Sequence, residues 1–254
     1  MERKLAPRSV IAAVLLFALS ACATQGEKIS KGDPWEPLNR SIYGFNDGLD
    51  RVLLKPLAKG YKFVTPDLVE RGVSNVFANL ATPITMVNNL LQGKPVDALS
   101  DAGRFVLNST VGVAGIFDPA TAAGLDKHSE DFGQTMAVWG VPSGPYVVLP
   151  FWGPSTLRGG VGLIPNQLLH GRNLIQDTGT RDKSFVLQII QGRASLLALD
   201  SQIAASNDPY IFVREAYLQN RNFVIYDGQP PQPEDDFDLD DDFDDDLDSF
   251  DDDL

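Results

Sequence analysis

Apolar residues recur every three to four positions over much of the chain, which is the spacing of amphipathic helices. From Leu38 the pattern runs through Ile42, Phe45, Leu49 and Val52 or Leu53. It predicts a first helix that begins after Asp33-Pro-Trp-Glu-Pro37 and that Pro56 interrupts.

Later helices share one start signal, a polar residue before a proline in the first helical turn. It occurs at Thr65-Pro66, Thr82-Pro83, Lys94-Pro95 and Asp208-Pro209. The longest helical pattern covers residues 182–205, with Phe185, Ile189, Leu196 and Leu199 or Ile203 on one side. These patterns predict a mainly α fold.

Residues 111–165 break this pattern, because glycine and proline are mixed there with aromatic and aliphatic residues. Tyr146–Leu149, between two prolines, predicts one short strand or an extended loop, so we expect at most one short strand or hairpin. The nearby aromatic residues are Phe117, Trp139, Phe151 and Trp152. They have two possible environments, buried beneath helices or facing acyl chains.

The N-terminus is built like a secretion signal that ends at the single cysteine. Arg3, Lys4 and Arg8 precede a short apolar run from Val10 to Leu19, and Leu19-Ser-Ala-Cys22 follows. This ending resembles a bacterial lipobox, in which Cys22 carries the acyl chains after cleavage. Two or more acyl chains give stable membrane anchoring. The alternative is a soluble periplasmic protein with a chance cysteine at the cleavage site.

Charge is distributed very unevenly. The formal net charge is −13, but Glu234 to Leu254 holds fourteen acidic residues and no basic one, which leaves 20 acidic residues against 21 lysines and arginines elsewhere. Leu239, Phe243, Leu247, Phe250 and Leu254 would share one face of a helix in this tail. Three roles stay open for it: folding onto a basic groove of a partner, weak binding of divalent cations, or simple solvation.

We divide the chain into a signal peptide (1–21), a lipidated tether (22–32), a helical domain (33–228) and a disordered Asp-rich tail (229–254). No cysteine remains for a disulfide or a thiolate metal site. No run of 18 apolar residues occurs, so no conventional transmembrane helix is predicted.

The sequence contains no G-x-S-x-G elbow, P-loop, G-x-G-x-x-G turn or β-lactamase signature of catalytic chemistry. His128 lies near Asp126, Glu130 and Asp131, which is a weak acid-base candidate that a solvated loop explains more simply. His170 and His128 show no metal-ligand spacing. We expect no enzyme activity, no metal, no cofactor and no nucleic-acid partner.

Many motifs in one order give the chain a specific resemblance. They are Asp33-Pro-Trp-Glu-Pro-Leu-Asn-Arg40, Tyr43-Gly-Phe-Asn46, Asn75 to Asn79 with Pro83, Met86-Val-Asn88, Leu91-Gln-Gly93, Arg104-Phe-x-Leu-Asn108, Gly112, Gly115, Asp118, Asp131-Phe-Gly133, Trp139-Gly140, Gly144-Pro-Tyr146, Leu149-Pro150, Leu157-Arg158, Asp208-Pro-Tyr-Ile211 and Val213-Arg-Glu-Ala-Tyr217. With the lipobox, they resemble the MlaA (VacJ) family of outer-membrane lipoproteins over about residues 33–228.

The resemblance implies a ring-shaped helical bundle in the inner leaflet of the outer membrane, with a central amphipathic channel. Phospholipids misplaced in the outer leaflet would pass through it to a periplasmic lipid-carrier protein, which maintains lipid asymmetry. A trimeric outer-membrane porin is the implied neighbour. The implied location is the outer membrane, lipid-anchored on the periplasmic side, and Ala23 in place of aspartate agrees with it. A porin-assembly lipoprotein and an envelope hydrolase are the alternatives.

The resemblance also implies channel and gating residues. The segment with Asn39, Arg40, Tyr43, Phe45 and Asn46 matches the helix beside the channel. Gly140 and Gly144 match a stretch next to the pore, where they would act as a hinge. The simpler interpretation makes Phe45 a core residue and the glycines turns.

Overall fold

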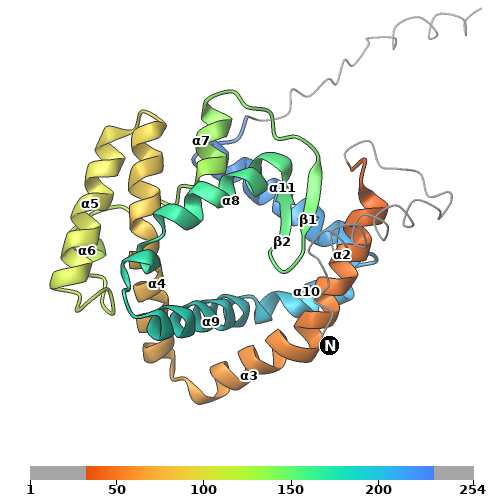
Figure 1. Ribbon diagram of the computed structural model, residues 1–254, viewed down its shortest axis with the longest axis horizontal. Coiled ribbons are helices and arrows are strands. Elements are labelled where there is room, and N and C mark those ends of the chain that lie inside the picture. Colours follow the sequence, from red (N-terminus) through yellow and green to blue (C-terminus); the bar gives the residue numbers. More distant parts are fainter. Residues whose placement is uncertain (1–32, 232–254) are drawn as a thin grey trace, which may run out of the picture.

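The computed structural model describes residues 33–231, and their fold is almost entirely helical (Figure 1). The signal peptide, Cys22, the tether and nearly all of the acidic tail lie outside the described residues. In the labels of Figure 1 the α-helices are α2 (Glu36–Leu49), α3 (Lys55–Val64), α4 (Asp67–Leu91), α5 (Pro95–Thr110), α6 (Pro119–Ala122), α7 (Phe132–Val138), α8 (Leu157–Leu169), α9 (Thr178–Ser195), α10 (Asp200–Ala205) and α11 (Pro209–Ile225). Shorter turns are η1 (Asp50–Leu54), η2 (Gly171–Leu174) and η3 (Leu197–Leu199).

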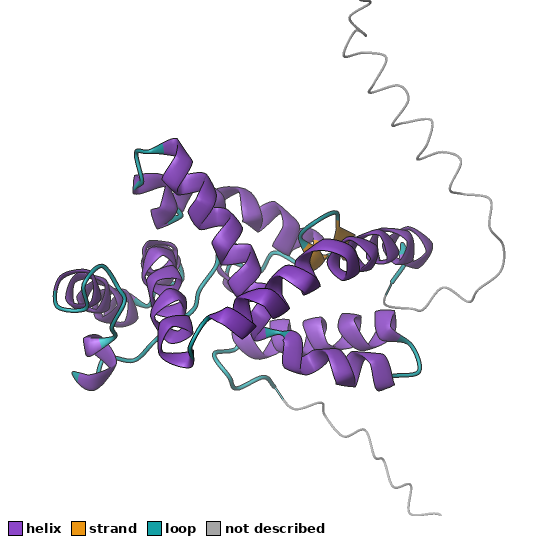
Figure 2. Ribbon diagram, turned by 90° about the horizontal axis from the view of Figure 1, so that it is seen from below, coloured by secondary structure: helices purple, strands orange, loops and turns teal. Residues whose placement is uncertain are grey.

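One small hairpin supplies the strands of the described region. β1 (Tyr146–Leu149) pairs antiparallel with β2 (Gly153–Thr156), so that Tyr146 lies opposite Thr156. Figure 2 shows how small this hairpin is beside the helices. The expected mainly α fold with one hairpin is therefore confirmed.

The elements follow one another around a ring (Figure 1). α3 packs on α9, α9 meets α4, and α4 contacts α7 and α8. The ring continues through α11 and the hairpin to α2, which lies against β1. α5 packs outside α4, and α6 packs on α5. The ring-shaped arrangement agrees with the sequence-based expectation.

Three of the four predicted proline start signals mark real helix starts. Pro95 and Pro209 lie in the first turns of α5 and α11 as predicted, and α4 begins directly after Pro66. The predicted start at Thr82-Pro83 is wrong, since Pro83 lies inside α4. The hydroxyl of Thr82 donates to the Ala78 carbonyl at 3.2 Å, and packing on α5 keeps α4 continuous despite the missing N–H.

Pro56 does not interrupt the first helix either. The chain stays helical from α2 into α3 because Asp50–Leu54 forms a π-helical turn, in which the Lys55 N–H donates to the Asp50 carbonyl five residues earlier. This wider turn lies directly before the proline ring, where a regular ladder would meet a clash. Pro56 therefore begins α3 instead of ending α2.

Two further expectations need correction. The pattern over residues 182–205 is divided among α9, η3 and α10, and α4 is the longest helix described. The stretch 111–165, expected to be irregular, contains α6, α7 and the start of α8. The Thr156 hydroxyl caps α8 by accepting from the Gly159 N–H at 3.1 Å.

The fold buries mainly polar side chains and exposes apolar ones, the reverse of the usual arrangement in a water-soluble domain. Among the described residues, nine apolar side chains are buried, against sixteen polar or charged ones, and 37 large apolar side chains are exposed. Phe117, Trp139, Phe151 and Trp152 all belong to the exposed set. An ordinary water-soluble domain buries its large apolar residues, so this surface needs an apolar covering.

Candidate functional site

α2 is attached to the hairpin by two asparagines on one face. The Asn39 amide donates to the Tyr146 carbonyl at 3.0 Å and accepts from the Val148 N–H at 2.9 Å. Seven residues later, Asn46 donates to the Leu149 carbonyl at 3.0 Å and accepts from the Phe151 N–H at 2.9 Å. Each side chain thus bonds the free edge of the hairpin as a neighbouring strand would.

A buried carboxylate holds the start of α2. Asp33 is fully buried and accepts from Asn39 at 2.8 Å and from the Tyr210 hydroxyl. Arg214 of α11 lies 3.6 Å away. Burial, with Asp33 next, raises the pKa of Tyr210, so this hydroxyl stays protonated and donates.

Arg40 joins the other side of α2 to the N-terminus of α11. Its guanidinium donates to both carboxylate oxygens of Asp208, at 3.3 and 2.8 Å, and to Glu36 at 2.8 Å. It also lies 4.4 Å from the centre of the Tyr210 ring. The hydrogen bond from Arg40 lowers the pKa of Asp208, so the carboxylate remains charged while it caps α11.

Tyr43 and Phe45 have different environments. Tyr43 packs edge-on against Tyr210, with ring centres 5.7 Å apart, at the aromatic cluster of Tyr146 and Tyr210. Phe45 is exposed and meets the exposed Phe151 of the hairpin turn at 5.4 Å. The simpler interpretation of Phe45 as a core residue is therefore wrong.

Gly140 and Gly144 lie in the loop from α7 to β1. Gly140 has φ +82° and ends α7, where its N–H donates to Ala137 and the next N–H donates to Met136. This is the Schellman arrangement that favours glycine. Gly144 has φ +67°, and a Cβ there would lie 2.9 Å from the Leu157 Cβ. Both glycines form turns, and their hinge role stays a prediction.

The structure gathers the five α2 residues at one junction of α2, the hairpin and α11. Gly144 lies two residues before β1, while Gly140 lies at the far end of the loop. The prediction of site residues did not include Asp33, Asp208, Tyr210 and Arg214, which complete the junction. Their signal was present in Asp33-Pro and Asp208-Pro-Tyr, two motifs far apart in sequence that pair in space.

The acidic group around His128 does not form one site. His128 Nδ1 lies 3.1 Å from Asp101, whereas Asp131 caps α7 and pairs with Arg221. Glu130 accepts from Gln92 and Gln134. Glu130 is buried, and its burial raises its pKa. The solvated-loop interpretation is wrong for Glu130, and the group diverges toward different helices.

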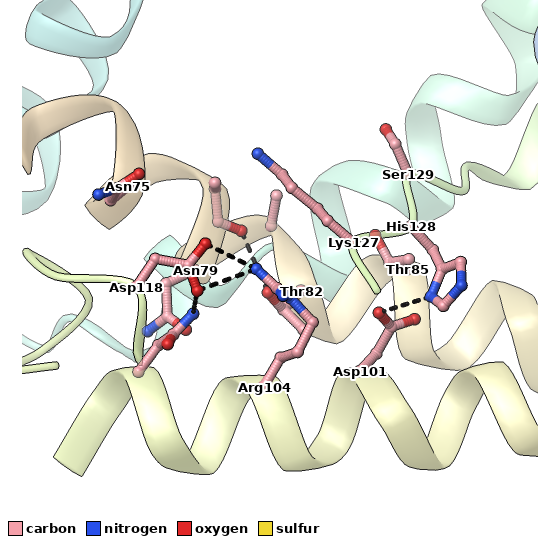
Figure 3. Close-up of a pocket in the computed structure, with 13 residues that line it drawn as sticks. Asn75, Asn79, Thr82, Thr85, Asp101, Arg104, Asp118, Lys127, His128 and Ser129 are labelled. Carbon is pink, nitrogen blue, oxygen red and sulfur yellow. Dashed lines mark hydrogen bonds and ion pairs between the residues drawn. The ribbon is translucent and has the colours of Figure 1, made fainter. Parts of the chain in front are cut away.

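A polar cavity of about 210 Å³ lies between α4 and α5 (Figure 3). Arg104 donates to both oxygens of Asp118 at 3.0 and 2.8 Å, and Asn108 donates to the same carboxylate at 3.0 Å. Both carboxylates of the lining, Asp101 and Asp118, have partners within the chain. The contacts with Asp118 join α5 to the N-terminus of α6.

Among the described residues, no group of three His, Cys, Asp or Glu side chains has the arrangement of a metal site. Of the helices in residues 33–231, none is both long and apolar enough to cross a membrane.

A family model described as MlaA lipoprotein matches residues 31–224. This chain belongs to the MlaA lipoprotein family. The match includes every α2 residue of the junction and both loop glycines, and it confirms the resemblance drawn from the motifs.

Relatives within the MlaA family agree along most of the chain. The Escherichia coli (strain K12) "Intermembrane phospholipid transport system lipoprotein MlaA" is 36% identical over 216 residues, covering 83% of this chain and 86% of that protein. The protein of the same name from Haemophilus influenzae is 30% identical over 237 residues, covering 87% and 92%.

A solved structure of the same fold is described as "Structural basis for maintenance of bacterial outer membrane lipid asymmetry". It has a TM-score of 0.68 and 35% identity, and it covers 77% of this chain and 100% of that chain. The MlaA fold of this chain is therefore shown by sequence and structure together.

Proposed function

We propose that this MlaA lipoprotein is the outer-membrane component of an intermembrane phospholipid transport system. It takes mislocalised phospholipids from the outer leaflet and passes them to a periplasmic lipid-carrier protein. Its cycle uses no cofactor beyond the acyl chains on Cys22. The names of the E. coli and H. influenzae relatives support the transport system, and the solved structure supports a role in lipid asymmetry.

The observation that carries this proposal is the inverted polarity of α5. Val96, Leu99 and Val106 are 77%, 74% and 58% exposed, whereas Asp101 and Arg104 on the opposite face are only 2% and 5% exposed. Acyl chains would cover such an apolar face without cost, and the polar side chains satisfy one another inside the protein. This is the surface of a ring that lies in a leaflet.

The lipidated Cys22 would complete the attachment. A monotopic protein needs neither a crossing helix nor a closed sheet, since its backbone bonds are already satisfied in helices. Anchoring on the periplasmic side of the outer membrane would bring the ring within reach of a soluble carrier and of a trimeric porin. In this role the α2 junction, with Asn39, Arg40 and Asn46, sets the position of the gate, and Gly140 and Gly144 shape the loop beside it.

The test is deletion of the gene, followed by measurement of phospholipid exposed on the cell surface. Surface phospholipid should rise, and the wild-type gene should restore the original level. Cys22→Ala should fail to restore it although the protein is made. Unchanged surface phospholipid in the deletion strain would overturn the proposal. Loss of porin trimers with asymmetry intact would favour an assembly role instead.

A further inference from the structure

The turn of the hairpin carries two large aromatic side chains. It joins Leu149 to Gly153, and Figure 1 shows that it projects toward α9 inside the circle of helices. Phe151 is 71% exposed and Trp152 is 55% exposed. Their aromatic partners belong to two different elements, α2 and α9, so the turn bridges two sides of the ring.

The turn is fixed firmly to α2. Asn46 donates to the Leu149 carbonyl at 3.0 Å and accepts from the Phe151 N–H at 2.9 Å. The ring of Phe151 also packs edge-on against Phe45, with ring centres 5.4 Å apart. Two hydrogen bonds and one aromatic contact therefore hold this side of the turn.

The contact with α9 is much weaker. Trp152 meets Phe185 with ring centres 6.3 Å apart, and no hydrogen bond or ion pair joins the hairpin to α9 within residues 33–231. Phe185 itself belongs to a fixed surface, because the guanidinium of Arg172 lies 4.4 Å from the centre of its ring and donates to Gln188 of α9 at 2.9 Å. One aromatic contact is weaker than the combined attachment to α2. The contact between Trp152 and Phe185 is thus the one that can break while the rest of the turn stays in place.

The backbone of the turn is strained, and there is space beside it. Phe151 has φ +67°, a conformation that bulky residues rarely adopt. Such strain persists only where neighbouring groups fix the backbone, as Asn46 does here, and it is common in segments that switch. Trp152 also lines a cavity of about 210 Å³ between the hairpin and α8, so its ring has unfilled space to enter when it leaves Phe185.

We propose that the hairpin turn is a gate across the ring, with its hinge at α2 and its latch at the contact between Trp152 and Phe185. In the closed state Trp152 lies on Phe185 and the turn spans the ring from α2 to α9. In the open state Trp152 leaves Phe185, Asn46 keeps the turn attached to α2, and the ring is wider beside α9. This inference rests on the proposed transport function, which it deepens by assigning control of the passage to one contact.

The first test measures whether the latch opens in the purified, full-length, lipidated protein in amphipol. Phe185→Cys is labelled with bimane, whose fluorescence is quenched by a tryptophan in contact with it. Cys22 is the single native cysteine, and its acylated sulfur does not react. The fluorescence decay should contain a quenched population, with Trp152 on the label, and an unquenched one.

Two variants assign the quenching. Trp152→Phe should abolish the quenched population. Trp139→Phe is the matched control, because Trp139 is 52% exposed, close to the value for Trp152, and lies at the end of α7 outside the hairpin. It should leave both populations unchanged.

The second test connects the latch to transport. The double variant Trp152→Cys and Phe185→Cys is expressed in the deletion strain, and a short bifunctional methanethiosulfonate bridges the two thiols. Surface phospholipid should then equal that of the deletion strain, and it should fall about threefold when dithiothreitol removes the bridge. In the single variant Trp152→Cys, the reagent and the reductant should cause no such difference.

Each contrary result overturns the proposal. One uniformly quenched population would show that the latch does not open, and the absence of quenching would show that it does not form. Equal surface phospholipid with and without the bridge, in a double variant that thermal unfolding shows to be folded, would mean that passage does not need the opening. If that variant is not folded, the fluorescence decay alone decides. The proposed function falls separately, since it depends on surface phospholipid in the deletion strain and not on the bimane populations.

Discussion

At the scale of single residues, two asparagine side chains make the hydrogen bonds that a neighbouring strand would otherwise make. A two-stranded hairpin leaves one edge of β1 without a partner, and unpaired buried backbone groups destabilise a fold. Asn39 and Asn46 each bridge a carbonyl and the N–H two residues later, which is the pattern of a peptide group in a ladder. Aspartate cannot replace them because it has no amide donor.

We expect Asn39→Asp to destabilise the protein by about 3 kcal/mol, because it removes two donors and places a second carboxylate beside buried Asp33. Asn46→Asp should cost only about 1 kcal/mol, since it is less buried and has no acidic neighbour of this kind. Chemical unfolding in detergent measures both. Equal losses would contradict the bridging role of Asn39.

The ion pair between Asp131 and Arg221 makes a pH-dependent contribution. Burial raises the pKa of Asp131, but the hydrogen bonds and charge of Arg221, with two backbone N–H groups, outweigh it and hold the pKa below the ordinary value of 3.8. This contribution is therefore complete above the ordinary pKa and is lost as the pH falls toward the folded-state pKa.

We expect Asp131→Asn to lower the melting temperature at neutral pH and to flatten its fall between about pH 5 and pH 3. Asparagine retains the cap of α7, so the change reports mainly the charge. Thermal unfolding over this pH range checks it. A variant with the same slope as wild type would show that the acid sensitivity arises elsewhere.

At the scale of elements, the two loop glycines differ in the space available for a side chain. Both have positive φ, so an alanine at either position costs about 1 kcal/mol through the backbone alone. At Gly140 the new methyl would meet nothing within 4 Å, whereas at Gly144 it would press on Leu157.

Gly144→Ala should therefore cost about 1 to 3 kcal/mol more than Gly140→Ala, measured by chemical unfolding. If Gly140 is instead a moving hinge, Gly140→Ala should disturb surface phospholipid in cells although it is the milder change for stability. Normal asymmetry with Gly140→Ala would leave only the capping role.

Helix periodicity predicted the elements better than their boundaries. The apolar spacing after Leu38 and the signals at Pro95 and Pro209 identified real helices. The boundaries predicted at Pro56 and Pro83 are wrong, because the π turn and tertiary packing compensate for the missing N–H groups of these prolines. Neither compensation can be predicted from the local sequence.

At the scale of the whole molecule, periodicity gives the existence of an apolar face but not its direction. Val96, Leu99 and Val106 have the spacing of one helix face, and the structure turns this face outward. The direction in which the apolar face points depends on the contacts of the opposite, polar face. Arg104 on that face pairs with Asp118 only because the chain reverses between α5 and α6. The same holds for the α2 junction, whose partners come from residues more than 100 positions away.

We expect the double change Leu99→Gln and Val106→Gln to alter stability in detergent by no more than about 0.5 kcal/mol, because both side chains are exposed. In a Cys22→Ala background it should reduce binding to phospholipid vesicles severalfold, as measured by flotation. The exposed change Gln219→Asn on α11 is the control. Unchanged flotation would mean that α5 does not face lipid.

The π turn at Asp50–Leu54 also sets the phase between two lengths of one helical rod. It contains one residue more than a regular turn, and Arg193 clamps it by donating to Asp50 at 2.7 and 2.9 Å. Each residue of an α-helix advances the side chains by about 100°. Loss of a single residue here would restore an even ladder and rotate all of α3 by that angle. The outward Leu57 and Phe63 would then rotate about the helix axis, away from the direction that they now face. The number of residues in this turn therefore determines which face of α3 is apolar on the outside of the ring.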